Sequence, residues 1–137
     1  MKEDTILLVR YGIGADSYLV GPGGGLENKE NVEQAIIRET MEETGITVHP
    51  LKVLWIEDLD CSRYKMSKTW MLCEVVAGEP TRTSGAKAED ITEARWFRRD
   101  ELNEEVVFPP PISRTEWSNL KSDAWQTVCL PSRVASF

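Results

Sequence analysis

Three glutamates that lie close together, Glu39, Glu42 and Glu43, are the residues whose types and spacing best suit chemistry. They belong to a segment, residues 31–44, that predicts a helix ending at Gly45, because glycine readily adopts the left-handed conformation that terminates helices. On a helical wheel the three acids continue the apolar stripe of the first turn. They therefore stand where an amphipathic helix normally carries core residues.

Such an acidic helix needs a counter-charge. An acidic run is usually a solvated face, but carboxylates three and four residues apart repel one another by roughly 0.2–0.5 kcal/mol per pair. Acids near a helix C-terminus also oppose the helix dipole. Arg38 stands beside the three acids and cannot neutralise them all. Because Mg²⁺ prefers hard oxygen ligands and shares them between carboxylates and phosphates, the helix favours a metal site that holds phosphates.

A glycine run, Gly23–Gly25, follows Pro22 and precedes this helix. It could be only a flexible turn. Glycine also lets the backbone approach a metal or a phosphate closely, which gives the run a use at this position. We expect the carbonyl oxygen of Gly24 to be a further metal ligand.

The whole stretch resembles the Nudix box, GX5EX7REUXEEXGU, in which U is a bulky aliphatic residue. The positions in register are Gly24, Glu30, Arg38, Glu39, Glu42, Glu43, Gly45 and Ile46. Only Thr40 departs, and its methyl group can still pack. The resemblance implies an α+β protein with the Nudix fold, an α/β/α sandwich with a mixed β-sheet.

The resemblance also implies hydrolysis of a nucleoside diphosphate linked to another moiety: a nucleoside triphosphate, a nucleotide sugar or a dinucleoside polyphosphate. Water would attack phosphorus with the help of Mg²⁺ or Mn²⁺. It implies that Glu39, Glu42 and Glu43 are metal ligands and that one of them accepts the proton of the attacking water. Arg38 would orient Glu39, and Glu30 would pair with Arg38 to lock the loop to the helix.

A carboxylate outside the box often serves the family as a ligand or base. Glu89, in the polar segment before Trp96, is our first choice, with Asp90 and Glu93 behind it. The alternative, that these are ordinary loop acids, stays open.

Markers of the substrate are weak. Trp55, Tyr64 and Trp70 are candidates to stack on a base, although aromatic residues on strands more often belong to the core. Tyr64 stands about 18 residues past the box, where the family suggests dinucleoside polyphosphates. No run like the SQPWPFxS of NADH enzymes occurs, and Cys61 and Ser62 stand where ADP-ribose enzymes carry a proline.

Composition limits the partners. The 137 residues carry 23 acids and 16 bases, a net charge of −7 that repels duplex nucleic acid and anionic membranes. Three cysteines without a CxxC motif and a single histidine argue against a disulfide scaffold and a zinc site. They favour a reducing, cytoplasmic compartment. No apolar run approaches the roughly 20 residues that span a bilayer.

The elements that would position these residues form one domain, 1–137, with strands and helices mixed irregularly, as in α+β proteins. The expected strands are residues 5–10, 17–20, 51–59, 67–76, 94–97 and 128–130. Helical segments are expected at 31–44, 99–102 and 113–122, a polar loop at 78–88, and a hairpin connection at 61–65. Residues 112–137 would be a C-terminal extension of one helix and one strand.

Nudix proteins usually place a strand ahead of the one expected at Ile6–Val9, and here only four residues precede the expected strand. Either the start of this sequence lies downstream of the usual one, or another segment fills the gap. We hypothesise that residues 128–130 or a partner chain fill that sheet edge. An unpaired edge also favours a homodimer.

Three functions fit the sequence. The first is a metal-dependent pyrophosphohydrolase. The second is a catalytically inactive Nudix-fold module that binds nucleotides or regulates. The third is an interaction protein with a structural acidic helix. The complete set of acids favours the first, because a degenerate member would be expected to lose its acids.

Overall fold

The computed structural model describes residues 1–27, 29–61 and 63–135. Asn28, Ser62 and residues 136–137 lie outside the described residues, so the hairpin connection expected at residues 61–65 is described only in part.

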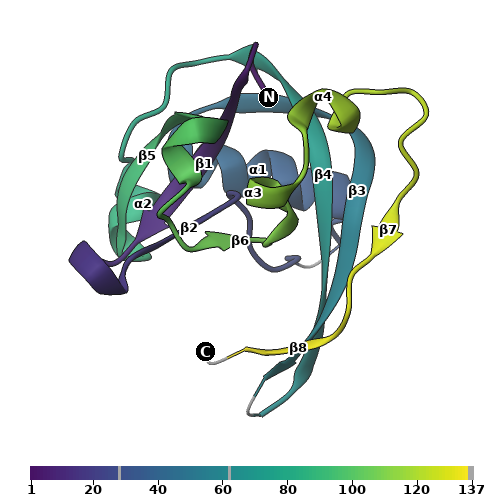
Figure 1. The fold of residues 1–137 in the computed structure, drawn as a ribbon. Helices are drawn as coiled ribbons and strands as arrows, with labels where there is room; N and C mark the ends of the chain where they lie inside the picture. Colours follow the sequence, from purple (N-terminus) through teal and green to yellow (C-terminus); the bar gives the residue numbers. More distant parts are fainter. Residues whose placement is uncertain (28, 62, 136–137) are drawn as a thin grey trace.

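The first sheet has the strand order β5-β1-β2-β6 (Figure 1). Its neighbours are antiparallel except β2 and β6, which run parallel. β1 is an apolar run that buries Leu7, Leu8 and Val9, and it takes the centre of the sheet between β5 and β2. The strands are β1 (Thr5–Tyr11), β2 (Tyr18–Val20), β5 (Ile91–Arg98) and β6 (Val107–Phe108), with a 3-10 turn, η1 (Gly14–Asp16), between the first two.

The second sheet is built on a long antiparallel hairpin of β3 (Thr47–Cys61) and β4 (Lys65–Ala77). Two short strands, β7 (Val128–Cys129) and β8 (Arg133–Ala135), pair in parallel with the other edge of β3. The long β3 offers there a row of backbone N–H and C=O groups with which short strands can pair.

This pairing corrects one expectation. The segment expected to fill the sheet edge beside Ile6–Val9 pairs instead with Trp55 and Ile56 of β3. β1 already has a neighbour on each side, so it leaves no vacant edge. The sheet-edge reason for a homodimer no longer applies, and the dimer stays a prediction.

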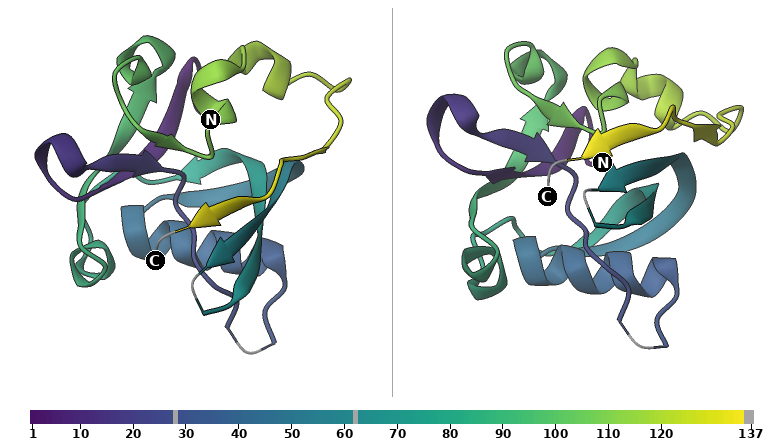
Figure 2. Two further views of the ribbon diagram at one scale, coloured as in Figure 1. Left: turned by 60° about the horizontal axis from the view of Figure 1, so that its bottom comes forward. Right: turned by 90° about the horizontal axis from the view of Figure 1, so that it is seen from below.

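The helices lie around the two sheets. α1 (Val32–Thr44) contacts β3 of one sheet, β5 of the other, and α2 (Figure 2). α2 (Ser84–Ala88) occupies the segment expected to be a loop. The helix expected at residues 113–122 is two short ones, α3 (Pro111–Arg114) and α4 (Trp117–Leu120), separated by the extended backbone of Thr115 and Glu116. The remaining turn is η2 (Arg99–Leu102).

The main core lies between the sheets and confirms the α+β class. It joins Leu8 and Leu19 of the first sheet to Leu54 and Leu72 of the second. The short C-terminal helices add Trp117 and Leu120, which are both buried. The core thus joins both sheets and the C-terminal segment.

Candidate active site

The ends of α1 are firmly defined. Asn31 caps the first turn in a capping box: its side-chain oxygen accepts the backbone N–H of Gln34, and the side-chain oxygen of Gln34 accepts the backbone N–H of Asn31. At the other end Gly45 takes the left-handed conformation, with φ 77°, and its N–H donates to the carbonyl of Met41 at 2.9 Å. The helix therefore holds its side chains at a fixed rotation against the glycine loop.

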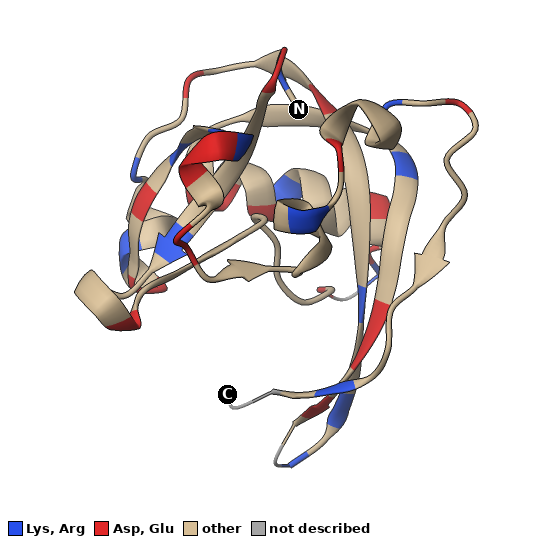
Figure 3. Cartoon of the chain, in the orientation of Figure 1, with Lys and Arg blue, Asp and Glu red and all other residues tan. Residues whose placement is uncertain are grey.

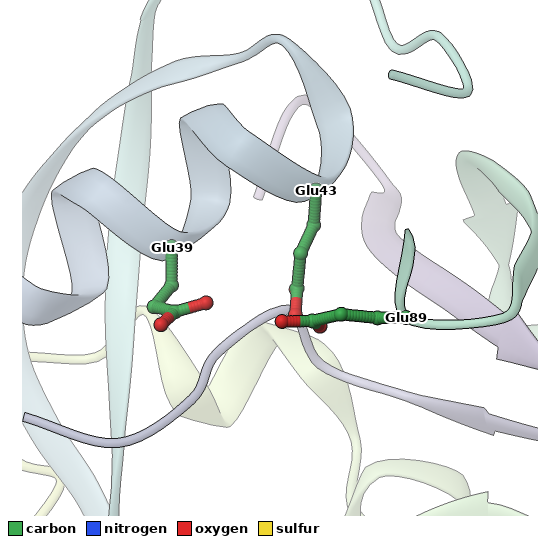
Figure 4. Close-up of side chains that lie close together, drawn as sticks. All are labelled: Glu39, Glu43 and Glu89. Carbon is green, nitrogen blue, oxygen red and sulfur yellow. The ribbon is translucent and has the colours of Figure 1, made fainter. Parts of the chain in front are cut away.

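Three carboxylates meet beside this loop. Glu39 and Glu43 hang from one face of α1, and Glu89 reaches them from the end of α2 (Figure 4). Each offers an oxygen that lies within 4.8 Å of the other two. Glu39 is 7% exposed and Glu43 only 1%, so neither belongs to a solvated face. This burial argues against a merely structural acidic surface helix.

Two oxygens of this cluster lack a donor. Glu43 Oε2 accepts the backbone N–H of Gly23 at 2.9 Å, and Glu39 Oε1 accepts Arg38 Nη1 at 2.8 Å. The second oxygens, Glu43 Oε1 and Glu39 Oε2, are buried and accept no hydrogen bond from any donor in the described part of the chain. Because unsatisfied buried carboxylate oxygens are costly, the arrangement fits a divalent cation with hard oxygen ligands.

Burial also changes the acidity of the cluster. It raises the pKa of Glu43, the neighbouring Glu89 carboxyl raises it further, and the Gly23 N–H partly opposes the shift. Burial likewise raises the pKa of Glu39, against the lowering effect of Arg38. A proton or a cation must therefore compensate the charge of these acids.

Gly24 lies directly against Glu39. A Cβ atom at Gly24 would stand 2.5 Å from the carboxyl carbon of Glu39, so no larger residue fits without moving that carboxylate. The glycine run is therefore a close approach of backbone to a functional side chain. Whether the Gly24 carbonyl oxygen binds metal stays a prediction.

Arg38 ties the loop to the helix. Its Nε and Nη2 donate to the two oxygens of Glu30 at 2.7 and 2.9 Å, and Nη2 also donates to the carbonyl of Gly25 at 3.0 Å. With the bond to Glu39, the contacts expected from the sequence are all present. A bidentate guanidinium–carboxylate pair fixes geometry as well as charge.

Glu42 differs from the other two helix acids. Its side chain is 48% exposed and pairs with Arg38 Nη1 at 3.2 Å. The helical wheel placed it on the buried stripe, but its position falls at the edge of that stripe, outside the group of Glu39, Glu43 and Glu89. Its role as a metal ligand stays a prediction.

α2 brings Glu89 into the cluster by docking on the end of α1. The hydroxyl of Thr83 donates to the carbonyl of Glu42, and the N–H of Thr81 donates to that of Thr44 at 2.9 Å. A Cβ at Gly85 would stand 2.6 Å from the Glu42 carbonyl oxygen, so glycine permits this close docking.

The two acids ranked behind Glu89 lie elsewhere. Asp90 is exposed and follows Glu89 with a left-handed backbone, φ 61°. Glu93 forms ion pairs with Arg10 and Arg95. Neither belongs to the group of three carboxylates.

The three aromatic candidates have different surroundings. Trp55 is 3% exposed and packs edge-on against Trp125 at 6.0 Å between ring centroids, so its burial contradicts stacking on a base. Tyr64 is 52% exposed in the turn between β3 and β4. Trp70 is half-buried, and its ring lies against Gly21, at the start of the glycine loop.

Sequence reasoning missed the N–H of Gly23 and the charged residues Glu57 and Arg133. Glu57 is 1% exposed and is bound by Arg133 of β8. The available signal was the alternation at the end of β3, where Glu57 shares the inward side with Leu59 and Cys61. An acid at an inward position calls for a buried partner.

The NUDIX domain model matches residues 1–117. The chain therefore belongs to the Nudix hydrolase family, which confirms the resemblance of residues 24–46. Curated relatives include the NAD-capped RNA hydrolase NudC of Salmonella heidelberg (strain SL476), 32% identical over 110 residues, and that of Salmonella agona (strain SL483), 34% identical over 113. Each match covers 80% of this chain, which spans only 39% of the length of these relatives.

Solved structures agree on the fold. A NUDIX hydrolase from Nitrosomonas europaea has a TM-score of 0.65 at 28% identity, covering 82% of this chain and 78% of its own. An ADP-ribose pyrophosphatase from Streptococcus suis 89-1591 has a TM-score of 0.64 at 22% identity, covering 95% and 92%. Among the described residues, none of the helices is long and apolar enough to cross a membrane.

Proposed function

We propose that this chain is a divalent-metal-dependent pyrophosphohydrolase that cleaves a nucleoside diphosphate linked to another moiety. The observation that carries the proposal is the group of Glu39, Glu43 and Glu89, with two buried oxygens that lack donors. Family membership supports the same chemistry. Bound Mg²⁺ or Mn²⁺ would neutralise phosphate charge and lower the pKa of a coordinated water.

The residues around the site take separate roles in binding the metal, holding the loop and accepting a proton. Glu39 and Glu43 hold the cation, Glu42 contributes from the edge of the site, and the Gly24 carbonyl oxygen completes the ligands. Arg38 keeps the Glu39 carboxylate and the loop in place through its bonds to Glu30. Glu89, the most exposed of the three grouped acids, takes the proton of the attacking water.

The substrate is a nucleoside triphosphate, a nucleotide sugar or a dinucleoside polyphosphate, so the group released with the nucleotide is phosphate or pyrophosphate, a sugar phosphate or a second nucleotide. The relatives named for NAD-capped RNA do not decide this, because the chain spans 39% of their length and lacks the run typical of NADH enzymes. Trp70, beside the glycine loop, is the aromatic candidate best placed to meet the substrate. A cytoplasmic enzyme acting as a monomer or a homodimer is consistent with this role.

The test is a substrate panel with Mg²⁺: nucleoside triphosphates, nucleotide sugars, dinucleoside polyphosphates, ADP-ribose and NADH. We expect hydrolysis of at least one class and a loss of about 100-fold in kcat/KM for Glu43→Gln, the size of loss seen when one preorganised electrostatic group is removed. Glu42→Gln should lose less, because Glu42 is half exposed.

Glu33→Gln is the matched control, because Glu33 is an exposed acid in the first turn of the same helix. Full activity of Glu43→Gln would contradict the metal-ligand assignment. An inactive panel with nucleotide binding retained would favour the non-catalytic Nudix module.

A further inference from the structure

Glu57 is the buried charge that the proposed chemistry does not use. It stands on β3 with a side chain that is 1% exposed. The indole N–H of Trp70 donates to its Oε1 at 3.0 Å. Lys68 is a second cation nearby, because its Nζ lies 5.5 Å from the centroid of the Trp70 ring. Burial lowers the pKa of Lys68, and the Glu57 carboxylate opposes that shift. Removing one partner of such a buried pair would leave an uncompensated charge, so the residues around Glu57 are expected to keep their places.

Arg133 supplies the counter-charge from the C-terminal segment. Its Nε donates to Glu57 Oε2 at 3.2 Å, and its Nη2 donates to Oε1 at 3.3 Å. The guanidinium also lies over the ring of Phe108, 4.6 Å from the centroid. Arg133 therefore connects β8 in the second sheet to β6 in the first. Figure 3 shows the basic segment of β8 beside acidic β3 and basic β4 segments.

Trp70, which donates to Glu57, also contacts the glycine loop. A Cβ at Gly21 would stand 3.0 Å from the Trp70 ring, so ring and backbone are in close contact. Two residues later the N–H of Gly23 holds Glu43, and the next residue, Gly24, packs on Glu39. The contacts thus run without a break from Arg133 through Glu57 and Trp70 to the buried acids.

We propose that Arg133 and Glu57 are positioning residues: through Trp70 they hold the glycine loop in the place where it orients Glu39 and Glu43. The C-terminal strand β8, which lies beyond the residues matched by the family model, would then be part of the active-site scaffold. The inference rests on the proposed function in that it assigns these residues to the metal site.

The experiment compares Arg133→Ala, Arg133→Lys and Glu57→Gln with Val134→Ala. Val134 is an 81% exposed neighbour on the same strand and is the matched control. Mn²⁺ affinity is measured by electron paramagnetic resonance of the free ion, and amide hydrogen exchange is followed over residues 21–25. Hydrogen exchange needs neither metal nor substrate, so it measures directly how firmly the loop backbone is held.

We expect Arg133→Ala to raise the Mn²⁺ Kd roughly ten-fold, the effect typical of residues that support metal ligands. Exchange of Gly23 and Gly24 should accelerate. Arg133→Lys should recover part of the Mn²⁺ affinity that Arg133→Ala loses. The Mn²⁺ Kd of Glu57→Gln should lie between those of wild type and Arg133→Ala, and that of Val134→Ala should match wild type. With an active substrate, excess metal should restore kcat while KM for the substrate stays unchanged.

Unchanged Mn²⁺ affinity and loop exchange in all three variants would overturn the proposal, even if melting temperature fell. A rise in substrate KM alone would also overturn it, because Arg133 would then contact substrate. Equal effects in Val134→Ala would assign the result to strand fraying and contradict it. If the wild type hydrolysed nothing on the panel but the loop still loosened in Arg133→Ala, the proposed function would fail and the positioning role would stand.

Discussion

At the scale of single residues, the close approach of Gly24 to Glu39 governs the site. A side chain there has no free volume, because its Cβ would lie 2.5 Å from the Glu39 carboxyl carbon. The neighbouring Gly25 has no atom within 4 Å of the equivalent position. Gly24 and Gly25 are neighbours in the sequence, but only Gly25 has room for a Cβ atom, so the two positions can be compared directly.

Gly24→Ala should lower kcat/KM by about 100-fold, since displacing a catalytic group by about 1 Å costs that much. Gly25→Ala should leave kcat/KM close to wild type. The Mn²⁺ Kd should likewise rise in Gly24→Ala and stay close to wild type in Gly25→Ala. Equal activity of the two variants would show that the Gly24–Glu39 contact does not matter for the reaction.

The buried acid Glu43 predicts an unusual pH dependence of stability in the metal-free protein. Its pKa is raised in the folded state, so the folded protein binds more protons than the unfolded chain above about pH 4.3, the ordinary glutamate pKa. The contribution of Glu43 to the free energy of unfolding is therefore lost as the pH rises towards the raised pKa.

Glu43→Gln removes this titration. In a chelator, the melting temperature of Glu43→Gln minus that of wild type should increase from pH 5 to pH 8. Saturating Mg²⁺ should reverse the order at pH 8, because only the wild type keeps the ligand. Differential scanning calorimetry measures both, and a difference that is constant with pH would mean that Glu43 titrates normally.

At the scale of elements, α1 could be predicted from the sequence, whereas α2 could not. The N-cap Asn31 and the terminal Gly45 are local signals, and so is the spacing of Arg38 from Glu30. α2 has five residues, and its main support is tertiary: Gly85 and Thr83 pack on the end of α1. Its docking, rather than its own sequence, places Glu89.

The docking of α2 makes Gly85 a positioning residue. Gly85→Ala would put a Cβ 2.6 Å from the Glu42 carbonyl oxygen, so α2 and with it Glu89 must move. We expect kcat to fall by roughly 100-fold, because displacing a catalytic group by about 1 Å costs that much. Ser84→Ala, an exposed change in the same helix, is the control. If Gly85→Ala kept full kcat, the exact position of Glu89 would not matter.

At the scale of the whole molecule, the parts that escaped prediction are those joined over long stretches of chain. Glu57 and Arg133 are separated by 76 residues, and nothing in the local sequence of either indicates the other. The pairing of β7 with β3 was also assigned to the wrong sheet, because short strands carry little register information of their own. Local motifs thus located the acids, and tertiary contacts decide which of them meet.

The whole molecule should also report metal binding through its thermal stability. Its net charge is −7 and its buried acids repel one another, so a cation that binds only the folded state stabilises it by mass action. At 100 times Kd this amounts to about 2.7 kcal/mol. For a domain of this size we expect a rise in Tm of roughly 8 °C.

NaCl of equal ionic strength controls for screening of the net charge. Glu39→Gln/Glu43→Gln should melt at the same temperature with and without Mg²⁺, and a full shift in this double variant would place the stabilising ion elsewhere on the protein.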